Sequence, residues 1–199
     1  MNTQHPNRWE GLAAILGGLL LATGSIHNMT NTATRAGTAA GMLMTLIALP
    51  LLVFAVTALY TAQAEQSRVL ARVAYTLSII GLTFTVGPVY VQFTGVSGDT
   101  LRTLRPIFDA GVPAVIALIS VVGLTLGFLL FGIATMRARV FSRWAGLILI
   151  VGAVVSFVPM PLVARIGGAV LGLGIAWLGW ALWSSKREAS VAAQPRPAM

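Results

Sequence analysis

The sequence has no cysteine and few charged residues. Without cysteine the chain has no disulfide, catalytic thiol, thiolate metal site or lipidated cysteine. Charged residues make up 9% of the 199 positions, against about 25% in a typical soluble domain. Hydrophobic residues make up 57%, which leaves too little polar surface to cover a globule in water. The composition therefore predicts an integral membrane protein.

The charges form short clusters between long apolar runs. Six runs reach or approach the roughly 20 residues that a helix needs to cross a bilayer. The helices are expected at residues 11–26, 38–62, 73–96, 107–136, 144–158 and 163–183. This pattern predicts an all-α fold, a polytopic transmembrane bundle of about six helices. A single domain is expected over residues 1–188, followed by a disordered cytoplasmic tail over residues 189–199.

Two of these helices leave alternatives open. The first is short, and Ala22-Thr23-Gly24 loosely fits a signal-peptide cleavage site; the long apolar run favours a retained helix. The last two are separated only by residues 159–162. Because Pro159 and Pro161 both break a helix, a tight hairpin is favoured over one kinked span.

Basic residues in the short loops predict the orientation. With both termini in the cytoplasm, nine cations lie inside and four outside. The inner set is Arg8, Arg68, Arg72, Arg137, Arg139, Arg143, Lys186, Arg187 and Arg196, and the outer set is Arg35, Arg102, Arg105 and Arg165. The net charge of +8 therefore suits membrane lipids and not nucleic acid. Arginine supplies 12 of the 13 basic residues, alongside much alanine and glycine, which indicates a high-GC bacterium and its inner membrane.

Two segments indicate an internal repeat. Residues 8–17 (RWEGLAAILG) and 143–152 (RWAGLILIVG) match at six of ten positions, and residues 72–81 (RVAYTLSIIG) keep the Arg, the Ile and the final Gly. The repeat predicts three helical hairpins descended from one, against the alternative of chance similarity among apolar helices.

Small residues spaced four apart predict close helix packing, because they let backbones approach in lipid. They lie at Ala164, Gly168, Gly172 and Ala176, at Gly123 and Gly127, and at Gly37 and Gly41. Contacts within the chain are favoured. The alternative partners are another membrane protein or a second copy of this chain.

Few residues are candidates for chemistry, and no catalytic motif is present. Ionisable groups at membrane depth are the default functional candidates. Asp109 is the strongest, as an acid or ion ligand, although it also suits a pair with Arg105 one turn away. Glu10 and His27 are weaker: an acid in a helix's first turn and a histidine at a helix end both have ordinary structural explanations. No spacing suits a metal, and no cofactor is implied.

The outer ends of the helices carry more polar chemistry than the inner ends. The ligand-binding candidates there are Tyr90, Gln92, Arg102, Arg105 and Asp109. Pro88 and Pro113 fall at similar depth, where prolines free backbone carbonyls and open pockets. We therefore expect an outward-facing vestibule between the third and fourth helices, with an ordinary polar rim as the alternative.

Three function classes follow. The favoured one is a non-enzymatic accessory subunit or a binder of a lipid-soluble molecule. The alternative is a membrane enzyme that uses carboxylates for acid–base chemistry on a hydrophobic, for example isoprenoid, substrate. A small transporter is disfavoured, because several helices lack interior polar groups.

The topology makes a testable prediction. A reporter that is active only in the periplasm, fused after Met199, should be inactive, because an even number of spans returns the chain to the cytoplasm. Fusion into the loop after residue 95 should give activity. High activity at the C-terminus would mean an odd number of spans.

Overall fold

The computed structural model describes residues 8–30, 38–95, 111–138, 142–158 and 160–192. Six α-helices account for nearly all of these residues, and the described part contains no strand. The helices are α1 (Arg8–Met29), α2 (Ala39–Gln63), α3 (Arg68–Gly95), α5 (Gly111–Ala138), α6 (Arg143–Ser156) and α7 (Pro161–Ala192). The all-α fold class is therefore confirmed.

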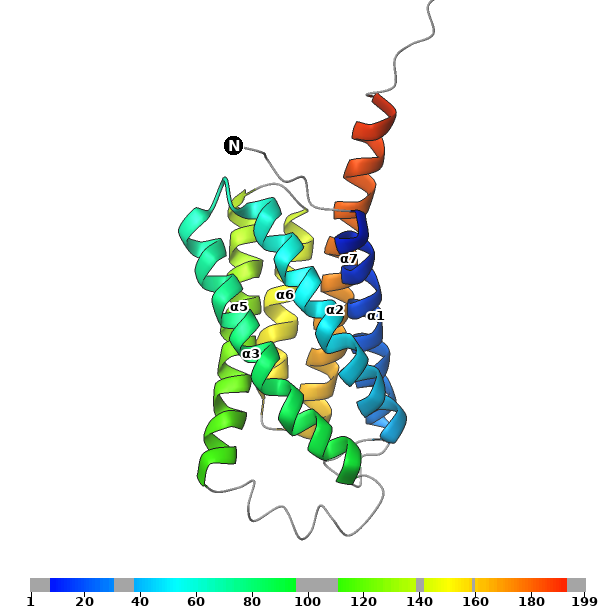
Figure 1. Ribbon diagram of the computed structural model, residues 1–199, viewed down its shortest axis with the longest axis vertical. Helices are drawn as coiled ribbons and strands as arrows, with labels where there is room; N and C mark the ends of the chain where they lie inside the picture. The colour runs from blue at the N-terminus through cyan, green and yellow to red at the C-terminus, as the bar shows by residue number, and fades with distance from the viewer. Residues whose placement is uncertain (1–7, 31–37, 96–110, 139–141, 159, 193–199) are drawn as a thin grey trace, which may run out of the picture.

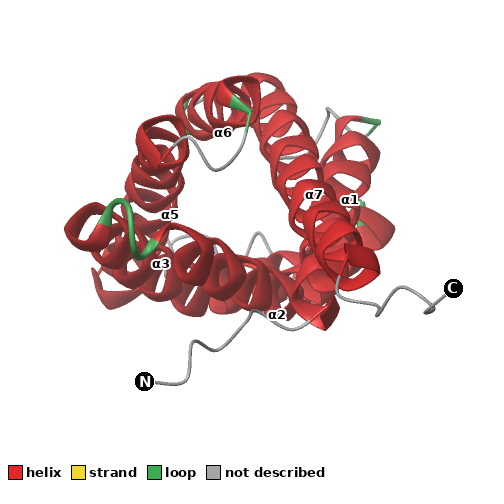
Figure 2. Cartoon of the chain, turned by 90° about the horizontal axis from the view of Figure 1, so that it is seen from above, coloured by secondary structure: helices red, strands yellow, loops and turns green. Residues whose placement is uncertain are grey.

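The helices form a closed antiparallel ring. Each helix packs on the next in chain order, and α7 packs on α1; the view along the bundle in Figure 2 shows this arrangement. The start of α1 and the end of α7 lie at the same end of the bundle (Figure 1). The ends of α1, α3 and α6 and the starts of α2 and α7 lie at the opposite end, so the ring has two distinct mouths.

Five of the helices are long and apolar enough to cross a membrane, namely α1, α2, α3, α5 and α7. The exception is α6, which has 14 residues and is therefore roughly 21 Å long at 1.5 Å per residue. A bilayer core is about 30 Å thick. The turn between α6 and α7 is consequently set back from the ends of α3 and α5 (Figure 1).

Glycines bring neighbouring backbones into direct contact. A Cβ added at Gly172 of α7 would lie 2.5 Å from the Gly18 carbonyl oxygen of α1, and one at Gly18 would lie 2.5 Å from the Gly172 carbonyl oxygen. Between α3 and α5, a Cβ at Gly81 would lie 2.4 Å from the Leu124 nitrogen. These small-residue faces thus lie in contacts within the chain, as the spacing predicts for Gly172.

The interior of the ring holds a single cluster of apolar side chains. Phe128 and Phe131 of α5 are fully buried there together with leucines from α2, α3, α6 and α7. Much of the large apolar surface points outward instead, for example Phe54, Leu118 and Leu173. A bundle with apolar residues on both sides suits a lipid surrounding rather than water.

The helix bounds differ from the expectation by one to nine residues. The first helix is longer than residues 11–26, because α1 runs from Arg8 to Met29. The third begins at Arg68 and not at residue 73. The last helix continues to Ala192, so residues 189–192 of the expected disordered tail are helical; residues 193–199 lie outside the described part. Of the helix expected at residues 107–136, residues 107–110 also lie outside the described part, and α5 begins at Gly111.

The glycine contacts predict a sharp difference between two identical changes in one interface. Gly172→Ala should lower the stability by about 1–3 kcal/mol, because the new methyl meets backbone atoms that cannot rotate away. Gly11→Ala lies in the same α1–α7 contact, but its added Cβ would meet α7 at an ordinary 3.4 Å. This control should be neutral or gain up to about 1 kcal/mol from helix propensity. Thermal unfolding in detergent measures both, and equal midpoints would contradict the packing described.

Candidate functional site

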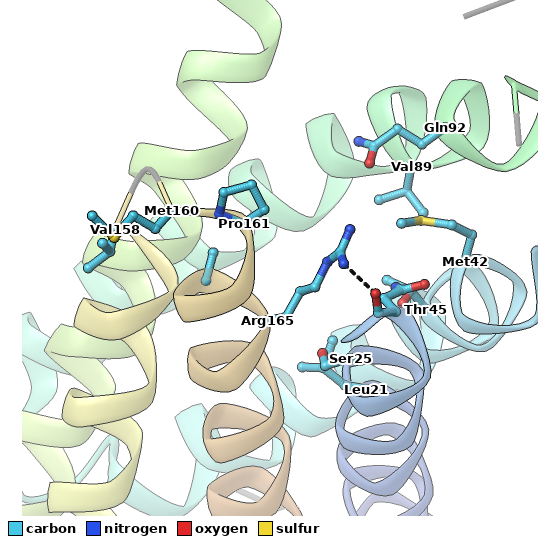
Figure 3. Close-up of a pocket in the computed structure, with 12 residues that line it drawn as sticks. Leu21, Ser25, Met42, Thr45, Val89, Gln92, Val158, Met160, Pro161 and Arg165 are labelled. Carbon is cyan, nitrogen blue, oxygen red and sulfur yellow. Dashed lines mark hydrogen bonds between the residues drawn. The ribbon is translucent and has the colours of Figure 1, made fainter. Parts of the chain in front are cut away.

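A pocket of about 420 Å³ opens at the mouth of the ring where α1 ends and α7 begins. Its volume falls within the roughly 300–1,000 Å³ of small-molecule sites. Four helices and the α6–α7 turn contribute to it (Figure 3). The described lining residues are Leu21, Ser25, Asn28, Met42, Thr45, Val89, Gln92, Val158, Met160, Pro161, Ala164 and Arg165.

Asn28 joins the end of α1 to the start of α2. Its side-chain oxygen accepts a hydrogen bond from the Thr38 backbone N–H at 3.0 Å. Thr38 is the N-cap of α2, and its hydroxyl accepts from the Gly41 N–H at 3.0 Å. Gly41 leaves room for this arrangement, because a Cβ there would collide with the Asn28 amide. Asn28 is only 5% exposed, so this side chain sets the geometry of one wall.

Arg165 supplies the positive charge of the pocket. It lies in the second turn of α7, which begins at Pro161, and is partly buried. Its Nη1 donates to the carbonyl oxygen of Asn28, and Figure 3 shows the side chain crossing from α7 to the end of α1. This carbonyl belongs to the last turn of α1, where backbone oxygens lack helical partners and favour a cation. The bond therefore fixes the guanidinium beside the cavity.

Neutral polar groups complete the pocket. Ser25 is 7% exposed, and its hydroxyl makes no hydrogen bond with any other described residue, nor does the Gln92 amide. Thr45 donates to the Gly41 carbonyl oxygen at 2.8 Å. Among the described lining residues there is no Asp or Glu, and Arg165 is the only charged residue. The pocket thus offers hydrogen-bond donors and a cation on an otherwise apolar wall.

The pocket is recessed from the ends of the longest helices at this mouth of the ring. Val158, Met160 and Pro161 line it from the α6–α7 turn, which is set back because α6 is short (Figure 1). Residues beside this turn expose apolar side chains, with Phe157 53% and Met160 62% exposed. Such a corner suits contact with lipid chains, which would put Arg165 near or below the membrane surface.

The expected binding residues are only partly represented here. Gln92 lines the pocket. Tyr90 is 57% exposed and is absent from the described lining. Arg102, Arg105 and Asp109 lie outside the described residues, so the structure does not show whether they contribute.

The prolines expected to open the vestibule play different parts. Pro88 lies inside α3, directly before the lining residue Val89. Pro113 is the third residue of α5 and does not interrupt that helix; the first turn tolerates proline because its N–H groups have no helical partner. The described lining includes no residue of α5. The described part of the pocket therefore lies between α1, α2, α3, the α6–α7 turn and the start of α7, not between α3 and α5.

The other two candidates do not line the pocket. His27 lies in the last turn of α1, and its side chain is exposed and is not among the described residues that line the pocket. Glu10 lies in the first turn of α1, at the opposite mouth. One of its carboxylate oxygens is buried without a hydrogen-bond partner, which is the only unusual feature of this residue. No group of His, Asp and Glu among the described residues could hold a metal ion.

Sequence reasoning missed the central residues of this pocket. Arg165 fell near the start of the helix expected at residues 163–183 and was counted among the outer-side cations, but it was not one of the ligand-binding candidates. Ser25 and Asn28 lie at the end of an apolar run, where a short polar residue looks like an ordinary helix end. The signal that could have revealed Arg165 was Pro161, because proline favours the first position of a helix and puts Arg165 four residues inside it.

A second buried polar contact lies away from the pocket. The Gln63 amide nitrogen of α2 donates to the Thr135 hydroxyl of α5 at 2.8 Å, and Thr135 donates to the Phe131 carbonyl oxygen at 2.8 Å. Gln63 and Thr135 are fully buried. This contact ties opposite sides of the ring near the end of α2 and does not reach the pocket.

No protein-family model, curated protein or solved structure matches the chain.

Asn28 gives a testable prediction about the pocket wall. Asn28→Ala should lower the stability by about 1–3 kcal/mol, because it leaves the partly buried Thr38 N–H without its acceptor. The neighbouring His27→Ala removes an exposed side chain and should change the stability by less than about 0.5 kcal/mol. Thermal unfolding of both variants in the same detergent measures the difference. A midpoint for Asn28→Ala equal to that of His27→Ala would refute the wall described here.

Proposed function

We propose that this chain is a multi-pass protein of the bacterial inner membrane that binds a lipid-soluble molecule in the pocket of Arg165. It acts as a binding or accessory subunit and not as an enzyme. The observation that carries the proposal is a pocket of about 420 Å³ whose walls are mainly apolar and which is recessed by the short α6. A recess of this kind receives molecules from the membrane more readily than from water.

Described cations support an orientation with both termini in the cytoplasm. Arg68, Arg72, Arg137 and Arg143 are exposed at the mouth opposite the pocket. Trp9 and Trp144 are also exposed there, at 78% and 68%, as expected for aromatic residues at a membrane interface. Arginine is enriched on the cytoplasmic side of membrane proteins, so the pocket faces the periplasm.

The acid–base alternative has less support. A membrane enzyme of that class needs a carboxylate at the pocket, and the described lining includes none. Glu10 and Glu65 lie at the opposite mouth of the ring. The pocket instead offers a cation and neutral donors, which bind and orient a molecule without exchanging protons with it at neutral pH.

We also propose that the three hairpins α1–α2, α3–α5 and α6–α7 are repeats of one ancestral unit. The glycines nine positions after the shared arginines support this, because Gly17, Gly81 and Gly152 each approach the next helix of the chain. Their added Cβ atoms would lie within 3.0 Å of Leu51, Leu124 and Leu171, respectively. Equivalent positions thus make equivalent contacts around the ring.

A neutral photoreactive probe tests binding of a lipid-soluble molecule. The full chain in nanodiscs is illuminated with a fatty alcohol that carries a diazirine in its chain, and the labelled residues are identified by mass spectrometry. We expect labels on Leu21, Met160 and their neighbours in the pocket. Ala164→Trp should abolish those labels by filling the cavity.

Leu173→Trp is the matched control, because Leu173 lies on the same helix but is 53% exposed on its outer face. It should leave labelling of the pocket unchanged. Labels spread evenly over the outer surface of the bundle, with no effect of Ala164→Trp, would refute the proposed function.

A further inference from the structure

We infer that the pocket selects an amphiphile with an anionic head, whose carboxylate or phosphate oxygens are held by Arg165 at the start of α7. This inference rests on the proposed function, because it names the chemical class that the same pocket takes. The shared chemistry is an oxyanion on an apolar chain, whether that chain belongs to a free fatty acid or to a lipid with a phosphate head.

The first argument is the placement of the cation. Arg165 is held over the pocket by its bond to the Asn28 carbonyl oxygen, and Asn28 is fixed by Thr38. The guanidinium therefore does not have to be ordered when a ligand arrives, which lowers the cost of binding. Arginine also matches the planar geometry of carboxylates and phosphates better than lysine does.

The second argument is the helix end that lies beside this cation. Pro161 and Ala164, in the first turn of α7, line the same pocket. Pro161 has no N–H, and the Ala164 N–H already donates to the Met160 carbonyl oxygen at 2.9 Å, so this end offers an anion only the partial positive charge of a helix N-terminus. A cation so close to this end is unfavourable for α7 itself, and an anion in the pocket would be attracted by both.

The third argument comes from the neutral groups. Ser25 is more than nine-tenths buried and lines the pocket without a hydrogen-bond partner among the described residues. The Gln92 amide faces the cavity from α3 on the far side (Figure 3). Ser25 and Gln92 can both donate to an oxyanion, and no described carboxylate in the lining would repel one.

The fourth argument concerns the rest of the ligand. Leu21, Met42, Val89, Val158 and Met160 form the apolar part of the lining. The α6–α7 turn that carries Met160 exposes apolar side chains outward. A ligand whose head meets Arg165 can therefore keep an apolar chain against these walls, whereas a fully hydrated ion such as free phosphate has nothing to place there.

Arg165 also has a structural role, since its bond to Asn28 closes the end of α1. The test must therefore separate loss of the anion contact from loss of the fold. A comparison of probes that differ only in their heads, made on the unchanged protein, does this, because every probe meets the same pocket.

The experiment uses the full chain in phosphatidylcholine nanodiscs at mildly alkaline pH, where the acid is ionised. Three diazirine probes share one apolar chain and carry a carboxylate, a phosphate monoester or an alcohol. We expect both anions to label the pocket more strongly than the alcohol, and unlabelled acid to displace the acid probe better than unlabelled alcohol does. The ratio of carboxylate to phosphate labelling identifies which oxyanion is preferred.

Variants assign the preference to Arg165. Arg165→Gln should weaken labelling by the acid roughly tenfold more than it weakens labelling by the alcohol, so the preference for the acid is lost. Arg165→Lys should keep most of the preference, because it keeps the charge. Arg143→Gln removes an exposed cation at the opposite mouth and should have no effect.

The outcomes separate the two proposals. Equal labelling and equal competition by acid and alcohol in the unchanged protein would overturn this inference while leaving the proposed function standing. An acid preference that survives in a folded Arg165→Gln variant would overturn the assignment to Arg165. If Arg165→Gln does not fold, the competition result and the Arg165→Lys variant decide. No labelling of the pocket by any probe would overturn the proposed function itself.

Discussion

The close approach of backbones at glycine is the constraint on which this fold depends. In lipid, helices gain little from excluding apolar surface, so contact distance decides whether they associate. Five of the six seams of the ring contain a described glycine whose added Cβ would lie within 3.0 Å of the neighbouring helix. The exception is the seam between α2 and α3, where the rings of Tyr60 and Tyr75 meet at 4.9 Å instead.

The pocket follows from this arrangement and from one short helix. Because α6 has only 14 residues, the α6–α7 turn stops before the end of the bundle and leaves the ring open there. Thr45 of α2 and Gln92 of α3 line two other sides of the pocket. The contact between these two helices includes no close approach at a described glycine. The opening thus lies where the ring is both shortest and least tightly closed.

Much of the fold could be predicted from the sequence, because hydropathy and proline act locally. The apolar runs identified six helices, and the spacing of Gly168 and Gly172 identified a packing face that meets α1. The depth of the α6–α7 turn could not be predicted, since it depends on how far the neighbouring helices extend. Gln92 was selected because it is polar near a helix end, whereas Arg165, near the start of the last expected helix, was counted only as an outer-side cation because the sequence does not show which side chain it meets across the ring.

The scarcity of acidic residues affects which ligands the pocket favours, because it leaves the charges around the pocket mainly positive. At Arg165 the carbonyl end of α1 and the N–H end of α7 meet, and the bond to Asn28 places the cation against the α1 end. That contact gives the carbonyl end of α1 a hydrogen-bond donor. The positive N-terminal end of α7 still faces the cavity. The acidic residues with described side chains, Glu10 and Glu65, lie at the other mouth of the ring, so neither would repel an anion in the pocket. An oxyanion that arrives with its own apolar chain would meet Arg165 where the apolar wall already favours that chain.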